Sequence, residues 1–185
     1  RVPLAQWELI CRRAGVPLPS PEVQAAGFWA WLLTLPTVPV IAAEGLKKAL
    51  AAISAGHAAL AVAGVDMGYR RDPDSSQLQL IPELEAIAAG GRRLVVVFDR
   101  EAKRSTAKRV ELAAAKLARL LSKAGADAAV ARLPLLKGGK AGLDDVLVAL
   151  GAGALDRAIE QAAAAPALAL LPQLPPPHTS AAHGQ

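Results

Sequence analysis

Three acidic residues stand directly after apolar segments, where buried strands are expected to end. Glu44 follows the run VPVIAA (38–43), and Asp99 follows LVVVF (94–98), with Glu101 two residues later. Ligands of open parallel sheets bind beyond the carboxyl ends of the strands, so these carboxylates are expected to meet at one edge. Their mutual repulsion predicts a divalent cation, and Mg²⁺ suits oxygen ligands that leave room for phosphate. In the alternative interpretation, Glu44 and Asp99 merely cap the helices that follow them.

Basic residues lie near these carboxylates in the sequence and predict contacts with phosphate groups. Lysine and arginine side chains neutralise phosphates without reading a base sequence. Each of these residues also fits an ordinary solvated surface. The predicted nucleic-acid-binding residues are Lys47, Lys48, Arg70, Arg71, Lys103 and Arg104.

Two further groups of charged residues have structural explanations. Asp144 and Asp145 follow the flexible run KGGKAG, where they fit extra metal contacts or, for one of them, the N-cap of a helix. Lys116, Arg119 and Lys123 fall on one side of a long helical pattern. We interpret that side as the solvated face of the helix.

The elements that position these residues alternate between strands and helices. Short apolar runs predict four strands, and helical spacing predicts the helices between them. This alternation predicts an α/β fold with a Rossmann-like parallel sheet of about four strands and helices on both faces. The polar segment 64–91 is expected to be a functional or mobile loop. The strands are 38–43, 57–64, 93–99 and 127–135, and the helices are 44–56, 105–125 and one that begins at 143.

Other elements flank the predicted sheet. Helical patterns over 4–15 and 21–35 come before it, and the aromatic residues of the second pattern, Trp29 and Trp31, are interpreted as packing residues rather than a platform for bases. The chain ends in a proline-rich run with the composition of a linker. The predicted parts are therefore a short helical extension (1–36), the α/β domain (37–165) and a disordered tail or linker (166–185).

The composition favours a cytoplasmic domain that binds a polyanion. The 185 residues carry a formal net charge of +5, and the pI is about 9.7. A single cysteine excludes an internal disulfide framework and fits a reducing compartment. Pro36 and Pro39 interrupt the most apolar stretch (28–43), so no membrane span is expected. The first residue is Arg1 rather than Met, which suggests a fragment of a longer protein.

Three motifs taken together are typical of one family. They are EGLKKA (44–49), GYR (68–70) and LDDVLVALG (143–151), within a similarity that runs from about 28 to 163. In these motifs the chain resembles the Toprim-like domain of cyanobacterial plasmid replication proteins, a domain of unknown function that is often fused to a helicase-like ATPase. The resemblance implies the fold shared by primases, type IA and II topoisomerases and small nucleases.

The resemblance also implies roles for the acidic residues. In the wider superfamily, a glutamate after the first strand acts as general acid or base, and a DxD pair after a later strand holds Mg²⁺. By position, Glu44 takes the first role, and Asp99 and Glu101 take the second, although Glu101 stands where the superfamily usually has Asp. All three are predicted catalytic residues and Mg²⁺ ligands. Glu can still ligate Mg²⁺, but its longer side chain changes the geometry.

The function implied is Mg²⁺-dependent phosphoryl transfer on nucleic acid during replication of a plasmid or mobile element. Primase-like nucleotide transfer and strand nicking both remain open. The implied partners are DNA or an RNA primer, together with a fused or associated helicase-like ATPase. In the alternative, the chain is a non-catalytic module that docks DNA for that ATPase, which fits the substitution at Glu101. A receiver domain needs an acidic pair after the first strand and a dinucleotide binder needs a glycine-rich turn, and EGLKKA supplies neither.

Overall fold

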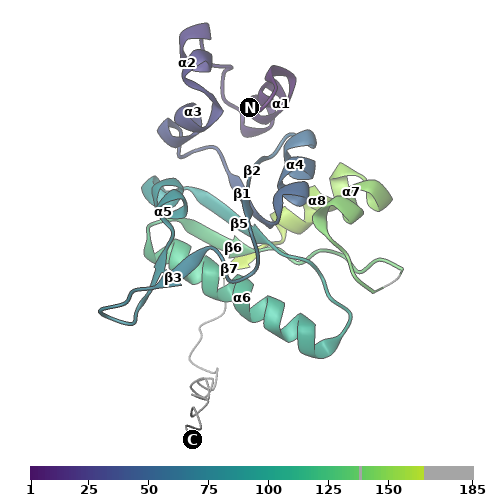
Figure 1. The fold of residues 1–185 in the computed structure, drawn as a ribbon. Helices are drawn as coiled ribbons and strands as arrows, with labels where there is room; N and C mark the ends of the chain where they lie inside the picture. Colours follow the sequence, from purple (N-terminus) through teal and green to yellow (C-terminus); the bar gives the residue numbers. More distant parts are fainter. Residues whose placement is uncertain (138, 165–185) are drawn as a thin grey trace, which may run out of the picture.

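The computed structural model describes residues 1–137 and 139–164, and a five-stranded sheet lies at its centre (Figure 1). The strand order is β2-β1-β5-β6-β7. The first four strands in this order are parallel to one another, and β7 runs antiparallel to β6 at the edge. The strands are β1 (Val40–Glu44), β2 (Ala58–Val62), β5 (Arg93–Val97), β6 (Asp127–Val130) and β7 (Ala163–Ala164).

The central strands are apolar except for one terminal residue each, because both faces of the sheet are covered. Residues 40–43 of β1 and 94–97 of β5 are all buried, as expected for parallel strands between two layers of helices. The predicted α/β fold is therefore confirmed. The sheet has one strand more than the four predicted, because β7 consists of two alanines, which carry no strand pattern.

Helices cover the two faces of the sheet. The crossover from β1 to β2 and the crossover from β5 to β6 run in opposite directions along the sheet, so right-handed connections place α4 and α6 on opposite faces. The helices α7 and α8 lie with α4, and α5 packs against α6 (Figure 1). Their bounds are α4 (Leu46–Ser54), α5 (Pro82–Ala88), α6 (Arg104–Lys123), α7 (Leu143–Leu150) and α8 (Ala152–Glu160).

The segment 64–91 is ordered structure, so its prediction as a loop is wrong. It contains an antiparallel hairpin of β3 (Tyr69–Arg71) and β4 (Leu78–Leu80), then α5 and a short 3-10 turn (Ala89–Gly91). The turn of the hairpin is set by Asp72, whose Oδ1 accepts hydrogen bonds from the backbone N–H groups of residues 74 and 75. The polar residues are solvated on a hairpin whose apolar residues face the core.

Glycine at position 68 lets the hairpin approach α6. A Cβ atom there would lie 2.9 Å from Leu117 and 3.0 Å from Leu84, which is closer than side-chain carbons pack. The glycine of the GYR motif thus has a packing role, because only hydrogen fits between β3 and the helices beneath it.

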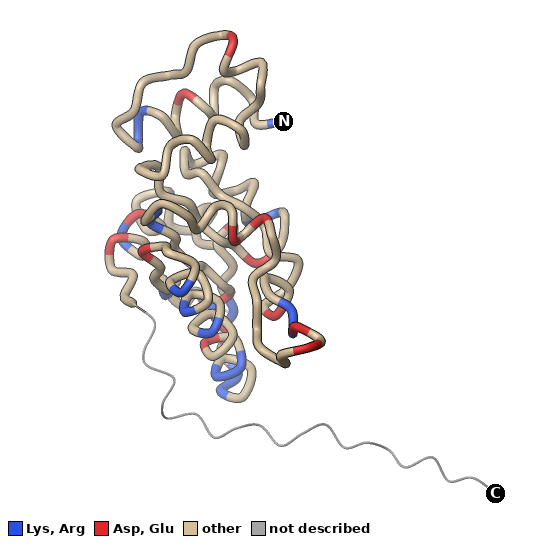
Figure 2. Tube along the Cα trace, turned by 90° about the vertical axis from the view of Figure 1, so that its left-hand side faces the viewer, with Lys and Arg blue, Asp and Glu red and all other residues tan. Residues whose placement is uncertain are grey.

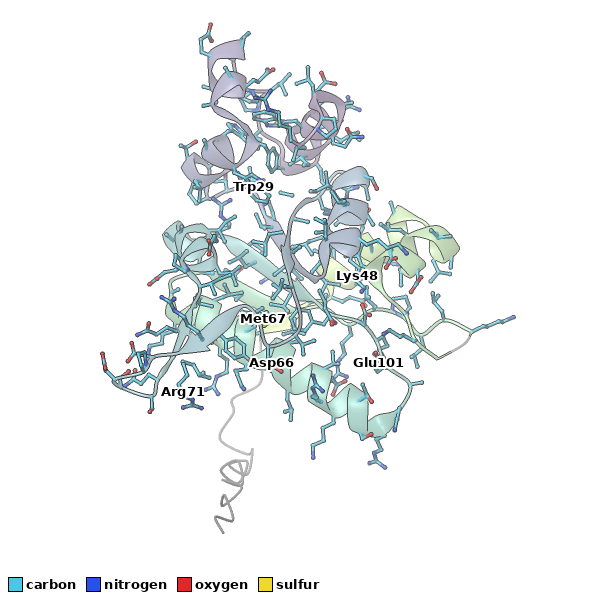
Figure 3. The ribbon with its side chains drawn as sticks, viewed as in Figure 1. Trp29, Lys48, Asp66, Met67, Arg71 and Glu101 are labelled. Atoms are coloured by element: carbon cyan, nitrogen blue, oxygen red, sulfur yellow. The ribbon has the colours of Figure 1, made fainter. Side chains whose placement is uncertain are left out.

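Three helices precede the sheet and share its hydrophobic core. They are α1 (Leu4–Ala14), α2 (Pro21–Ala26) and α3 (Phe28–Thr34). The pattern predicted as one helix over 21–35 is divided at Gly27, where φ is +99°. Trp31 packs against the rings of Trp7 and Phe28 with centroids 5.3 and 5.5 Å apart. Trp31 is buried as predicted, whereas Trp29 is 44% exposed (Figure 3).

No helix in the described ranges is long and apolar enough to cross a bilayer. The apolar stretch 28–43 forms α3, a turn and the buried strand β1, so its hydrophobicity is used for packing. The predicted linker 166–185 lies outside the residues that the structure describes.

A buried arginine joins the N-terminal helices to the sheet. Arg92 is 1% exposed and immediately precedes β5. Its guanidinium donates to carbonyl oxygens at distances of 2.7–2.9 Å, and no carboxylate pairs with it in the part of the chain that is described. The arginine satisfies the carbonyls at the end of α3 and in the turn after it, which would otherwise be buried without donors. The acceptors are the carbonyls of Leu32, Leu35, Val38 and Ile87.

We expect Arg92→Met to lower the free energy of unfolding by about 3 kcal/mol or more, because several buried carbonyls lose their donor at once. Arg92→Lys keeps the charge with fewer hydrogen-bond donors. Its free energy of unfolding should fall between those of the wild-type protein and Arg92→Met. The control Arg132→Met breaks an exposed ion pair to Glu111 and should cost less than about 1 kcal/mol. Urea unfolding followed by circular dichroism measures all three. Equal losses of unfolding free energy in Arg92→Met and Arg132→Met would contradict the role of Arg92 as the donor to these buried carbonyls.

Candidate functional site

The register of β1 and β5 brings two of the predicted acidic residues to the same edge of the sheet. Ala43 of β1 is paired with Val97 of β5, so Glu44 and the residues after Val97 leave the sheet side by side. Glu44 is the last residue of β1 and is partly buried. Asp99 comes two residues after β5 ends and is 7% exposed. Both lie at the carboxyl ends of parallel strands, where α/β folds bind ligands.

Asp99 is a buried carboxylate that is compensated by two lysines. The Nζ atom of Lys48 lies 3.2 Å from Asp99 Oδ1, and the Nζ atom of Lys140 lies 3.4 Å from Oδ2. Although Lys48 is close enough for an ion pair, Oδ1 accepts no hydrogen bond in the described structure. Asp99 therefore keeps one buried oxygen with unused capacity for a ligand.

Glu101 belongs to the same charge cluster through Lys140. The Nζ atom of Lys140 is 3.0 Å from Glu101 Oε1, so one ammonium group bridges the carboxylates of Asp99 and Glu101. Figure 3 shows Glu101 and Lys48 on the same side of the molecule, near the ends of the central strands. The cluster holds the carboxylates of Glu44, Asp99 and Glu101 and the ammonium groups of Lys48 and Lys140.

Lys140 reaches the cluster because its loop returns to the edge of the sheet. Arg100 and Ala141 form an isolated antiparallel bridge with backbone hydrogen bonds of 2.8 and 2.9 Å in both directions. Sequence analysis missed Lys140 because this contact joins residues 41 positions apart. The available signal was the glycine-rich run KGGKAG, where Gly139 has a φ of +85° and a Cβ would lie 2.8 Å from Ala102.

Asp144 and Asp145 lie in the first turn of α7, although neither is its N-cap. The N-cap residue is Gly142, whose N–H donates to Asp145 Oδ2 at 2.9 Å in a capping box. Asp144 instead accepts an ion pair from Lys47 at 2.8 Å. The prediction that one of these two aspartates is the N-cap is wrong, because the helix begins one residue before them. Lys47 is 85% exposed and faces Asp144 rather than the central carboxylates.

Neither Glu44 nor Asp99 caps a helix, so the capping interpretation is wrong. The N-cap of α4 is Gly45, and the N-cap of α6 is Lys103, and neither helix has a side-chain capping hydrogen bond. Gly45 has a φ of +85°, which lets the chain turn sharply between Glu44 and α4. The two carboxylates are consequently free for interactions across the edge of the sheet.

The electrostatic environment of Glu44 favours its protonated form. Desolvation raises the pKa of Glu44, and repulsion from Asp99 raises it further. Attraction to Lys48 and Lys140 lowers the pKa but does not cancel the rise. A carboxyl group with a raised pKa beside other charges is a common property of groups that transfer protons, although structural clusters also produce it.

The Mg²⁺ site predicted for Glu44, Asp99 and Glu101 stays a prediction. Among residues 1–137 and 139–164, no group of three or more His, Cys, Asp or Glu side chains lies close enough to hold a metal ion. Lys48 and Lys140 relieve the repulsion that was expected to require one. Asp99 and Glu101 alone fit Mg²⁺, because this ion is commonly bound through one or two carboxylates plus water and phosphate oxygens. The free capacity of Asp99 Oδ1 is consistent with that fit.

The other predicted basic residues lie outside this cluster. Arg70 and Arg71 belong to β3 of the hairpin, and Figure 3 shows Arg71 well apart from Lys48 and Glu101. Lys103 and Arg104 are exposed at the start of α6, a few residues after Glu101. The structure thus brings only Lys48 of the predicted basic residues into contact with Asp99.

An apolar cavity of about 610 Å³ opens beside Asp99. It lies between α6 and β6, with Val110 on one wall and Val130 on the other. A second cavity of about 780 Å³ lies between the N-terminal helices and α4, and none of the predicted site residues lines it. The smaller cavity is the one with room for part of a substrate next to the carboxylates.

Comparison with known proteins places the site inside a matched region. Residues 28–154 match the family model described as Domain of unknown function (DUF3854). Over 161 residues the chain is 37% identical to an uncharacterized protein of the cyanobacterium Picosynechococcus sp.. That alignment covers 84% of this chain and 16% of the relative, so the chain spans about a sixth of the relative's length. No solved structure matches the chain.

We expect Glu44→Gln to stabilise the protein at neutral pH and to have no such effect in acid. The pKa of Glu44 is raised in the folded state, so ionisation is easier in the unfolded chain. The wild-type protein therefore loses stability, relative to Glu44→Gln, as pH rises from about 4.3 through the raised pKa. Urea unfolding between pH 4 and pH 8 in the presence of EDTA measures this difference.

Glu22→Gln is the control, because its effect on the free energy of unfolding should change with pH in the opposite direction. A hydrogen bond with Ser20 lowers the pKa of Glu22, so the wild-type carboxylate adds stability above its ordinary pKa and loses it in acid. A difference between wild type and Glu44→Gln that is independent of pH would show that the surroundings of Glu44 do not disfavour its charge.

Proposed function

The chain belongs to the DUF3854 family, and we propose that it is the Toprim-like module of a plasmid or mobile-element replication protein in the cytoplasm. In this role it catalyses Mg²⁺-dependent phosphoryl transfer on nucleic acid, by primer synthesis or by strand nicking. The observation that carries the proposal is the buried carboxylate of Asp99, which lies at a strand end beside Glu44 and keeps one oxygen without a hydrogen bond.

Burial of the Asp99 carboxylate costs free energy, because the charge loses its contact with water. A buried charge is retained only where paired groups compensate it, and a leucine or valine at this position would avoid the cost entirely. The fold instead supplies two lysines from different elements, α4 and the loop before α7, to hold a charge at the edge of the sheet. Such an arrangement is typical of functional sites.

Each residue has a role in the proposed reaction. Glu44 accepts the proton of the attacking hydroxyl group as that oxygen forms its bond to phosphorus, and the leaving oxygen departs with the electron pair of the broken P–O bond. Lys48 and Lys140 stabilise the charge that develops on the phosphoryl oxygens. Asp99 and Glu101 are the residues that would hold Mg²⁺, which supplies Lewis-acid stabilisation of those oxygens. The cavity beside Asp99 has room for a nucleoside part of the substrate.

A second candidate function is a non-catalytic module that docks DNA for a fused helicase-like ATPase. The observation that favours it is the bridge from Lys140 to both Asp99 and Glu101, which compensates part of the charge of these carboxylates without any metal ion. The length of the Picosynechococcus relative is consistent with a domain that works inside a longer chain.

The purified chain is expected to synthesise primers on single-stranded DNA or to nick supercoiled plasmid in Mg²⁺, and to lose this activity in EDTA. Glu44→Gln should reduce the rate by about 10²-fold to 10⁴-fold, the usual contribution of a positioned acid or base. Glu85→Gln, which changes an exposed side chain of α5, is the matched control and should retain wild-type activity. Product formation on denaturing gels measures both reactions.

Equal rates for wild type and Glu44→Gln would rule out the catalytic proposal. If no turnover occurs in Mg²⁺, and if DNA binding survives the removal of Asp99 and Glu101, the docking function is supported instead. Circular dichroism of each variant establishes that a lost activity does not come from lost folding.

A further inference from the structure

The helix α6 presents a continuous basic face to solvent. Figure 2 shows Lys and Arg recurring along this helix. Glu111 is its only acidic residue. Its six basic residues are all exposed except Lys116, which is half-buried, and the N-cap adds a seventh. They are Lys103, Arg104, Lys108, Arg109, Lys116, Arg119 and Lys123.

These cations are not used in ion pairs within the described ranges of the chain. Some basic side chains elsewhere in the structure are paired with carboxylates, as for Lys47 with Asp144 and Arg93 with Asp127. Among the described residues, the one partner of this basic face is the ring of Tyr69, which lies under the ammonium of Lys116, 5.2 Å from the ring centroid. Packing and internal charge compensation therefore do not explain why this face carries so many cations.

The positions of the cations follow the helical repeat. Residues 108 and 119 are eleven positions apart, about three helical turns, and 123 lies four positions further along. Residue 109 is next to 108, and 116 lies seven positions after 109, about two turns. All five therefore lie on one side of the helix. The opposite side holds Ala114, Leu117 and Leu121, which are buried against the sheet. The basic face is therefore displayed outward at a fixed orientation, which favours a partner with regularly repeated negative charge.

We propose that this face of α6 binds the phosphate backbone of double-stranded DNA. At about 1.5 Å per residue the helix is about 30 Å long, which matches roughly nine base pairs at about 3.4 Å each. The choice of DNA as the polyanion rests on the proposed function. A membrane fits poorly, because a helix that binds lipid inserts an apolar face, and the apolar face of α6 is already buried in the core.

The same geometry connects the binding face to the candidate site. Glu101 is only three residues from the start of α6, and Asp99 lies beside it with Lys140 bridging the two carboxylates. A duplex held along α6 would extend toward the edge of the sheet where Asp99 lies. Contacts to phosphates position a nucleic acid without reading its bases, so this face fixes the path of the DNA and leaves sequence preference to other residues.

The test measures binding of the whole chain to a fluorescein-labelled 20-base-pair duplex of arbitrary sequence by fluorescence anisotropy, from 50 to 200 mM salt. The variant combines Lys108→Gln, Arg119→Gln and Lys123→Gln, which retain good helix formers on exposed positions. The control combines Arg12→Gln, Lys137→Gln and Arg157→Gln, which remove the same charge from exposed residues outside α6. The α6 variant should bind more weakly, and its plot of log Kobs against log salt should be shallower by about 2.7, or about 0.9 for each lost phosphate contact.

Several outcomes would overturn the inference. Equal weakening by the two triple variants would show that only net charge matters, and an unchanged salt slope in the α6 variant would show that this face does not contact phosphates. Loss of binding to phosphatidylserine vesicles, with DNA binding unchanged, would assign the face to a membrane. Circular dichroism that matches the wild-type spectrum shows that the variant retains its helix.

Failure of the inference can be told apart from failure of the proposed function. Glu85→Gln leaves α6 and the candidate site intact and should keep the wild-type salt slope whether or not the chain is catalytic. Binding that depends on α6 without any turnover would support the inference and contradict catalysis. Turnover that depends on Glu44, combined with normal DNA binding by the α6 variant, would support catalysis and contradict the inference.

Discussion

The compensation of one buried carboxylate organises the candidate site. Asp99 lies almost wholly out of water, so its negative charge requires cations that the fold must hold in place. Lys48 comes from α4 directly after β1, and Lys140 comes from a loop pinned by the Arg100–Ala141 bridge. Three segments that are distant in the sequence therefore have to meet for Asp99 to be tolerated. The same requirement brings Glu44 into an environment that disfavours its charge.

The fold could be predicted from the sequence to the extent that its elements have strong local patterns. The runs around Val40 and Val95 are continuous and apolar, and they became parallel strands buried on both faces. The hairpin β3–β4 was missed because its strands have three residues each and its turn depends on Asp72, whose contacts become visible only in three dimensions. The strand β7 was missed because two alanines have no pattern of their own.

Among the members of the cluster, the acidic residues and Lys48 were named from the sequence, whereas Lys140 was not. Glu44 and Asp99 stand at the ends of clear strands, and topology alone brings strand ends together. Lys140 could not be found in this way, because its position depends on a backbone bridge across a glycine-rich loop. The consequence is electrostatic, because Lys48 and Lys140 compensate part of the charge of the acidic residues from within the protein.

Two groups of positive charges in this chain have different physical roles. In the first, cations such as Lys48, Lys140 and Arg13 sit against carboxylates, where moving them would leave a buried or half-buried charge uncompensated. In the second, on α6, the cations face water with a single acidic residue among them. Repulsion within this second group lowers the stability of the free protein slightly, because like charges one turn apart disfavour the helix. A polyanion that lies along the helix removes this repulsion, so the arrangement that is unfavourable in the isolated chain becomes favourable in the complex.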